Sequence, residues 1–135
     1  MAVGPIINCL VCEGVRQEIQ NKYTVLGFFG IAPHVRIAIR DFKLPVTLCF
    51  FFCGTTAGGK VKLSVKLIDR SGQQVPNRIP QSLDATFDSS NLATFIVLFF
   101  EGVVPGPGEY KVSLIIDERE HYSTQFALAA NSPLN

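Results

Sequence analysis

Two phenylalanine-rich segments place the strongest limit on how this chain folds. They run from Val46 to Cys53 (VTLCFFFC) and from Leu92 to Phe100 (LATFIVLFF). Each is about as long as one strand, is rich in β-branched and aromatic residues, and is apolar on both faces that a strand presents. The pair therefore predicts an all-β domain in which two strands are buried on both sides.

Other segments alternate apolar and polar residues with the period of a half-buried strand. Residues 110–116 alternate in this way, and after a turn at 117–120 the chain returns through 122–128 with the same period. The two runs predict an antiparallel hairpin. Residues 61–67 alternate as well, and the lysines between their apolar positions predict a strand with one solvated face.

The remaining strand signals are shorter or interrupted. Residues 6–19 and 23–29 predict two strands around a turn at 20–22, and residues 35–39 predict another. The segment from Gln73 to Asp88 contains Pro76 and Pro80. Because proline cannot donate to a β-ladder, we expect this segment at a sheet edge.

The spacing of these signals predicts the fold class. Strand signals recur every ten to fifteen residues with turn residues between them, which is typical of a β-sandwich. We expect a single antiparallel β-sandwich, immunoglobulin-like, with about eight to nine strands. The length of 135 residues suits one domain, and no linker or repeat divides residues 1–135.

Composition and charge argue against several classes of protein. A formal net charge of +1 gives no electrostatic reason to expect nucleic acid, which requires clustered Lys and Arg. The apolar runs are far shorter than the roughly twenty residues of a membrane-spanning helix. The segment Met1 to Ile7 has no early Lys or Arg, so it is not typical of a secretory signal and we expect a cytoplasmic protein.

Four short motifs occur in an order that resembles a known kind of protein. They are Cys12-Glu13, the Gly-Phe-Phe-Gly segment from Gly27 to Gly30, the turn from Leu67 to Gly72, and the Pro-Gly-x-Tyr segment from Pro107 to Tyr110. In this order the chain resembles uncharacterised small bacterial β-sandwich proteins with the turn and strand pattern of immunoglobulin-like and fibronectin-type domains. The resemblance implies the sandwich fold, and it implies no catalytic residue.

The four cysteines form two close pairs, Cys9 with Cys12 and Cys49 with Cys53. Four thiolates could form a structural zinc site, but residues three apart on a strand point to opposite faces. Phe51 lies between the second pair. We therefore expect buried free thiols, with zinc and a disulfide as alternatives, and we expect no cofactor.

The segment from Gly54 to Lys60 fits the spacing G-x-x-x-x-G-K of a phosphate-binding loop. The next residue is Val61, where the motif requires Ser or Thr, and the following residues alternate as a strand instead of opening a helix. Without a helix N-terminus the phosphate would lose its amide donors. The segment is therefore interpreted as a hairpin loop.

The acidic residues near the last predicted turn offer a possible cation site. Asp117, Glu120 and His121 carry oxygen and nitrogen donors suited to a divalent cation. The alternative is a solvated charged turn. The only other histidine is His34, so the chain offers no clear nucleophile–base–acid triad, and we expect a protein that is not an enzyme.

The apolar surplus of the two phenylalanine-rich strands leads to the main functional hypothesis. A two-layer sandwich covers only one face of each sheet, so the outer face of these strands needs a cover. We expect a homo-oligomer or a protein partner there, with the contact made by Phe51, Ile96, Leu98 and Phe100. The alternative cover is the loop from Gly30 to Lys43. A second function, from a different class, is binding of a small ligand or divalent cation by loops 54–60 and 117–121.

Overall fold

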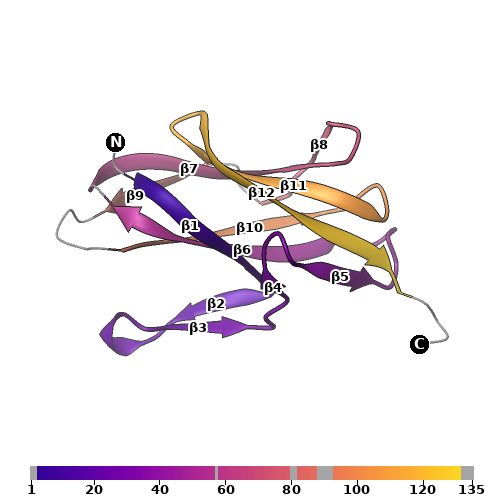
Figure 1. Cartoon of the computed structure of the whole chain (residues 1–135), viewed down its shortest axis with the longest axis horizontal. Helices are drawn as coiled ribbons and strands as arrows, with labels where there is room; N and C mark the ends of the chain where they lie inside the picture. The colour runs from indigo at the N-terminus through magenta and orange to yellow at the C-terminus, as the bar shows by residue number, and fades with distance from the viewer. Residues whose placement is uncertain (1–2, 57, 80–81, 88–92, 132–135) are drawn as a thin grey trace.

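The structure is a computed structural model, and it describes residues 3–56, 58–79, 82–87 and 93–131. These residues form 12 strands and one short 3-10 segment, η1 (Ile19–Asn21), with no α-helix among them (Figure 1). The all-β prediction is confirmed, and the strand number exceeds the expected eight or nine because several strands are very short. No helix in the described ranges is long and apolar enough to cross a membrane.

Three strands and a short edge piece form the first sheet, which we call the aromatic sheet. Its order is β10 (Thr94–Gly102), β6 (Val46–Thr56), β1 (Val3–Cys12) and β4 (Gly30–Ile31), with antiparallel neighbours throughout. The two phenylalanine-rich segments are β6 and β10, and they pair with each other along the whole of β10. Among the predicted positions, Pro80, Asp88 and Leu92 lie outside the described residues.

The second sheet, which we call the lysine-faced sheet, has the order β5 (Arg36–Ile39), β12 (Arg119–Ala130), β11 (Gly108–Ile116), β7 (Gly59–Ile68) and β8 (Gln74–Val75). A further strand, β9 (Leu83–Phe87), also pairs with β7. The sheet is mixed because β5 runs parallel to β12. The predicted edge position of the Gln73–Asp88 segment is confirmed, since β8 and β9 both lie beyond β7.

The hairpin of β11 and β12 forms as the alternation predicts. Its turn consists of Asp117 and Glu118, which have φ angles of 50° and 69°. Two successive positive φ angles are typical of a type I′ turn, whose twist matches that of the flanking strands. The turn is therefore shorter than the four residues expected, and β12 begins at Arg119.

The third sheet is a small hairpin of β2 (Gly14–Gln17) and β3 (Tyr23–Leu26). The predicted strand over residues 6–19 is wrong in one respect, because the chain bends at Glu13 and divides into β1 and β2. The Glu13 N–H donates to the carbonyl oxygens of Leu26 and Gly27 at 3.0 and 3.1 Å. β2 therefore pairs with β3 instead of continuing in the aromatic sheet. Figure 1 shows this hairpin on the side of the aromatic sheet that faces away from β7, β11 and β12.

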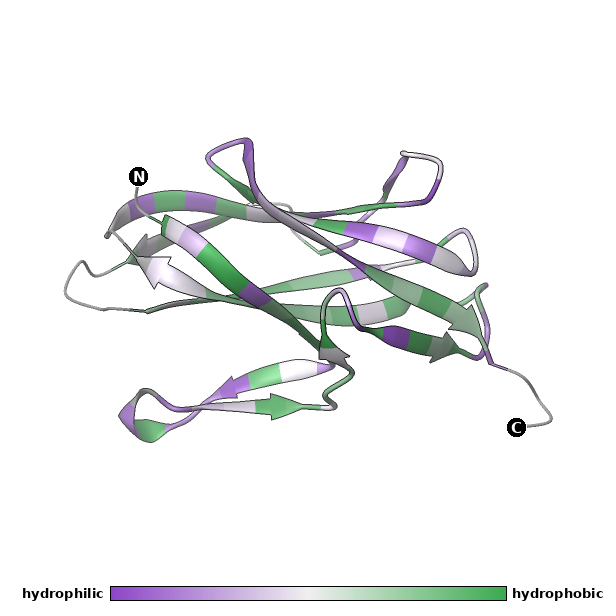
Figure 2. Ribbon diagram, in the orientation of Figure 1, coloured by the Kyte–Doolittle hydropathy of each residue, from purple (hydrophilic) through white to green (hydrophobic). Residues whose placement is uncertain are grey.

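The hydrophobic core lies between the two large sheets. Phe50 and Phe52 of the aromatic sheet are fully buried there, and the Phe50 ring lies 5.6 Å from the ring of Phe126 across the core. The lysine-faced sheet contributes the apolar half of its alternating strands. Figure 2 shows this difference, with alternating colour along β7 and nearly continuous hydrophobic colour along β10.

Two segments of the chain bridge the sides of the sheet pair. On one side the chain passes from β4, in the aromatic sheet, to β5, in the lysine-faced sheet. On the other side the segment that follows β8 runs beside the end of β10, where the Arg78 N–H donates to the carbonyl oxygen of Glu101 at 2.8 Å. The arrangement is a curled pair of sheets that is partly closed on both sides.

Candidate functional site

On the outward side of the aromatic sheet, the side chains of register partners form rows across β1, β6 and β10. Residues that pair across strands share a face, and the register aligns nine residues there. We call this surface the outer aromatic face. Its three rows are Cys12–Cys49–Phe99, Leu10–Phe51–Val97 and Asn8–Cys53–Phe95.

The four residues expected to form a contact face lie on both sides of this sheet. Phe51 belongs to the outer aromatic face. Ile96, Leu98 and Phe100 lie on the opposite side of β10, within the core, and none is more than 4% exposed. Because Phe51 pairs with Val97, it shares a face with the odd-numbered residues of β10. The four therefore do not form one surface.

The β2–β3 hairpin covers the centre of the outer aromatic face. The Tyr23 ring lies 5.5 Å from the Phe51 ring and 5.1 Å from the Phe95 ring, measured between centroids. Phe51 is only 4% exposed as a result. The suggestion that the loop from Gly30 to Lys43 covers this face is wrong, because that segment supplies β4 and β5 to the two large sheets.

The hairpin leaves the β10 side of the face open. Phe95 and Phe99 are 43% and 37% exposed, although both are aromatic residues on a sheet strand. Single exposed apolar residues are normal, but a group of them marks an interaction surface. The chain also exposes large apolar residues around the hairpin: Ile19, Leu26, Phe28, Phe29 and Ile31.

The backbone of β10 has a free side next to these rings. The Asn77 side chain donates to the Phe99 carbonyl oxygen at 3.1 Å and accepts from the Glu101 N–H at 3.0 Å. Odd-numbered residues of β10 therefore direct their backbone groups away from β6. By the same alternation the N–H and C=O groups of Phe95 and Val97 point outward, and within the described ranges they have no partner there. We call this part of β10 the open edge.

The acidic and histidine residues of the last turn have separate partners. Asp117 Oδ1 accepts the Lys62 N–H at 2.9 Å, and His121 Nε2 lies 2.8 Å from the Gly4 carbonyl oxygen. Glu120 contacts Lys111 at 2.9 Å and Ser113 at 2.8 Å, and these bonds lower the pKa of its carboxyl group. In the part of the chain that the structure describes, no group of three His, Cys, Asp or Glu residues could hold a metal ion.

The two loops considered for ligand binding meet at one end of the molecule. Lys60, Lys62, Asp84 and Asp117 line a cavity of about 510 Å³ between β7, β9 and the last turn. Lys60 lies in a strand, since β7 begins at Gly59, so no helix follows the segment that resembles a phosphate-binding loop. The cavity presents two cations and two carboxylates.

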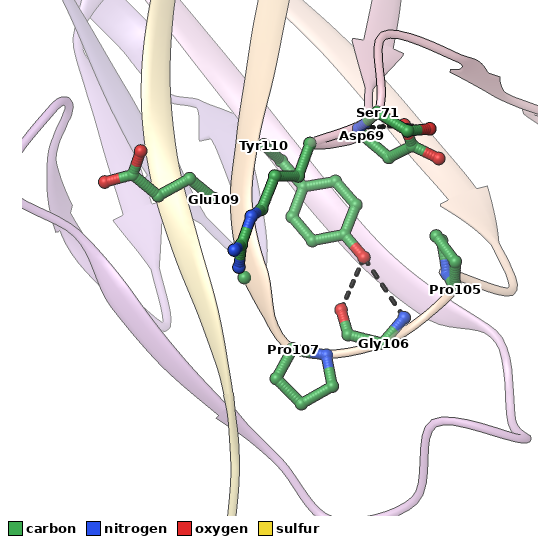
Figure 3. A pocket seen from close by; sticks show the side chains of 9 residues that line it. Asp69, Ser71, Pro105, Gly106, Pro107, Glu109 and Tyr110 are labelled. Atoms are coloured by element: carbon green, nitrogen blue, oxygen red, sulfur yellow. Dashed lines mark hydrogen bonds between the residues drawn. The ribbon is translucent and has the colours of Figure 1, made fainter.

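A second cavity, of about 240 Å³, lies between the turn after β7 and the turn before β11 (Figure 3). The Tyr110 hydroxyl donates to the Gly106 carbonyl oxygen at 2.5 Å and accepts from the Gly106 N–H at 3.3 Å. Asp69 accepts bonds from Ser71 and Gln73, which lower the pKa of its carboxyl group. These polar groups form their hydrogen bonds within the two turns that line the cavity. They therefore stabilise the turns and are not available to a ligand.

The predicted burial is confirmed for three of the four cysteines. Cys9, Cys12 and Cys49 are fully buried, Cys53 is partly buried, and all four are free thiols. Cys9 faces the core, whereas the other three lie on the outer aromatic face. Burial raises the pKa of Cys53 to about 11, so its thiol is neutral at physiological pH.

Comparison with known proteins places the chain in a family. The model of a family of unknown function, DUF6941, matches residues 8–129. No curated protein matches the chain. One solved structure with similarity is the Pseudomonas fluorescens alkylpurine DNA glycosylase AlkC bound to DNA containing an abasic site analog, with a TM-score of 0.40 and 13% identity. That match covers 73% of this chain and only 28% of the glycosylase chain. Because the family model spans most of its length, this protein belongs to the DUF6941 family.

Proposed function

We propose that this protein is a non-catalytic self-assembly module, an immunoglobulin-like sandwich that pairs with a second copy through the open edge of β10. The observation that carries the proposal is the outward backbone of Phe95 and Val97, unpaired within the described ranges and bordered by exposed aromatic rings. A second copy would add its β10 to the aromatic sheet.

The strand order supports the immunoglobulin-like assignment. β1, β6 and β10 correspond in order to strands A, B and E of that fold, and β7, β11 and β12 to strands C, F and G. Tyr110, near the start of β11, bonds back to Gly106 four residues upstream. This contact resembles the tyrosine corner found at the start of strand F in that fold. Domains of this architecture serve many functions, so the fold alone assigns none.

The open edge lacks the features that natural proteins use to prevent edge pairing. Exposed edges are usually protected by charged residues, proline or a covering segment. Asn77 and Arg78 cover the end of β10 near Glu101. The stretch from Thr94 to Phe100 contains neither a charged residue nor proline, so nothing in its sequence opposes pairing.

A second copy is the occupant that fits this edge best, because the edge is complementary to itself. In an antiparallel pairing about a two-fold axis at Ile96, Phe95 of each copy lies opposite Val97 of the other. Aromatic and β-branched residues make favourable cross-strand pairs, each contributing about 0.2–1 kcal/mol relative to alanine. Such an interface uses the same patch on both subunits and closes as a dimer.

The solution mass of the purified chain, measured by light scattering over a concentration series, tests the proposal. We expect a dimer that dissociates on dilution. Phe95→Lys should give a monomer, because it places a charged side chain opposite Val97 of the other copy, and lysine on an edge strand opposes pairing. Leu44→Lys is the matched control, since Leu44 is 60% exposed in the loop before β6, away from the open edge. A wild-type monomer at every concentration, or equal effects of both variants, would contradict the proposal.

Small-ligand or divalent-cation binding is the second candidate function, and one observation favours it. Loops 54–60 and 117–121 contribute Lys60 and Asp117 to the same cavity, together with Lys62 and Asp84. A cavity with two cations and two carboxylates suits a small zwitterionic ligand better than a cation. Adding calcium or glycine betaine and measuring the shift in Tm tests this, because a bound ligand stabilises the folded state. No shift at millimolar concentrations would count against it.

A further inference from the structure

Cys12 and Cys49 lie directly opposite each other on neighbouring strands. They are register partners on β1 and β6, and both are fully buried. They belong to one row of the outer aromatic face, so their side chains leave the sheet on the same side. The Cys12 thiol donates to the Cys49 carbonyl oxygen, with a sulfur–oxygen distance of 3.7 Å.

The backbone pairing places the two α-carbons at a separation that suits a disulfide. Ala32 and Phe29 donate their N–H groups to the carbonyl oxygens of Cys9 and Val11, both at 2.9 Å. The backbone N–H and C=O groups of the odd-numbered residues in this part of β1 therefore point away from β6. By alternation, the backbone groups of Cys12 point toward β6 and pair with those of Cys49. Residues paired in this way have α-carbons about 5.5 Å apart, within the range of about 4.4–6.8 Å found in disulfides.

No other pair of cysteines in the chain has this arrangement. Cys9 faces the core and its partner on β6 is Phe52. Cys53 lies opposite Asn8 and is four residues from Cys49 along β6, a distance of about 13 Å at the usual rise per residue. Oxidation within one folded chain can therefore join only Cys12 and Cys49.

The two thiols differ in acidity, which favours reaction between them. A hydrogen bond from the Cys49 thiol lowers the pKa of Cys12, and the Gly14 N–H adds to this effect. The same contact and burial raise the pKa of Cys49. Cys12 is thus the thiol more readily converted to thiolate, the form that attacks an oxidant.

We propose that Cys12 and Cys49 form an oxidisable dithiol, a modification site that a small peroxide converts to a disulfide. The Cys12 thiolate attacks hydrogen peroxide, which breaks the O–O bond, forms a sulfenic acid and releases hydroxide. The Cys49 sulfur then attacks the sulfenic sulfur, and the S–S bond forms as the S–O bond breaks. Together the thiols lose two electrons and two protons, and the peroxide is reduced to two water molecules.

The disulfide would fix the base of the β2–β3 hairpin. Glu13, the residue after Cys12, holds the hairpin through its bonds to Leu26 and Gly27. The new bond would join positions 37 residues apart in sequence, and such a link stabilises a fold mainly by restricting the unfolded chain. The oxidised protein should therefore have a higher Tm than the reduced one.

The test treats the full-length reduced protein with hydrogen peroxide, blocks remaining thiols with an alkylating agent, and maps the peptides by mass spectrometry. We expect a mass loss of about 2 Da before alkylation, a linked peptide pair containing Cys12 and Cys49, and reversal by dithiothreitol. Cys53→Ala should retain the link, whereas Cys49→Ala should abolish it. The oxidised wild-type protein should melt several degrees higher.

Both thiols are buried, so the experiment also needs a control for the access of peroxide to them. The reaction is repeated in urea below the unfolding transition, where local opening exposes the pair to peroxide. Four free thiols after treatment under both conditions would overturn the proposal. A disulfide formed mainly through Cys9 or Cys53 would overturn it as well. Peptide mapping of the wild-type protein gives this result, so the test does not depend on the folding of any variant.

Discussion

At the scale of single residues, Tyr110 shows how one hydroxyl group holds a loop. It is 3% exposed, and its hydroxyl bonds both the carbonyl oxygen and the N–H of Gly106. We expect Tyr110→Phe to lower the free energy of unfolding by about 0.5–1.5 kcal/mol, the usual net value of such a bond. Urea unfolding measures this as a lower midpoint with an unchanged slope.

Tyr23→Phe is the matched control for this prediction. It removes the same hydroxyl group from a ring that packs on Phe51 and Phe95, and we expect a change within about 0.5 kcal/mol. Equal losses of unfolding free energy in the two variants would show that the hydrogen bonds between Tyr110 and Gly106 do not stabilise the protein.

Cys53 gives a second prediction at this scale. Its pKa of about 11 leaves very little thiolate at pH 8, and thiolate is the reactive form. We expect alkylation of Cys53 by iodoacetamide at pH 8 to be slower than that of a free cysteine by about two orders of magnitude. Mass spectrometry of the native protein over time checks this, with the urea-unfolded protein as the reference. Alkylation at a similar rate in both states would contradict it.

The residue scale also shows what the sequence can and cannot predict. The alternation of β7 identifies its buried residues correctly, since only one face of that strand is apolar. On β11 the same pattern misses Ser113 and Ile115, which are buried on the other face. On β10 both faces are apolar, so the pattern does not distinguish Leu98 from Phe99. Only the pairing of β10 with β6 shows that Leu98 lies in the core and Phe99 on the surface. That pairing joins distant parts of the chain.

At the scale of elements, the β2–β3 hairpin acts as the cover of the outer aromatic face. Tyr23 supplies its contacts with Phe51 and Phe95. We expect Tyr23→Ala to lower the free energy of unfolding by about 1–3 kcal/mol, from lost apolar burial and lost ring contacts. Binding of the dye ANS, which reports exposed apolar surface, should increase as well. Stability and dye binding equal to those of Tyr23→Phe would contradict a covering role.

The hairpin is also the element that local pattern predicts least well. The apolar character of residues 6–19 continues through the bend at Glu13, so the sequence indicates one strand. The bend depends on the bonds from the Glu13 N–H to Leu26 and Gly27, which lie in another segment. By contrast, the hairpin of β11 and β12 is predicted well because its turn and both strands are contiguous and each strand alternates over most of its length.

At the scale of the whole molecule, the two sheets differ in how well their edge strands are protected against pairing with another chain. The lysine-faced sheet ends in β5 on one side and in β8 and β9 on the other, all of five residues or fewer. Short edge strands limit pairing with other chains. The aromatic sheet ends in the short β4 on one side and in β10 on the other, a strand of nine residues that the described parts of the chain cover near Glu101 alone. This contrast supports the proposal that a second copy pairs at the β10 edge.

Proline substitutions can separate backbone pairing at that edge from simple apolar contact. The Val97 N–H points away from β6, so Val97→Pro removes a donor that the monomer does not use within the described ranges. We expect it to abolish the dimer while keeping a cooperative unfolding transition. Ile96→Pro removes a donor that bonds to β6 opposite Phe52, and it should destabilise the monomer by about 3 kcal/mol or more. Light scattering and thermal unfolding of both variants measure the two effects. A Val97→Pro protein that still dimerises would show that side chains alone hold the copies together, and the open edge would then have no part in assembly.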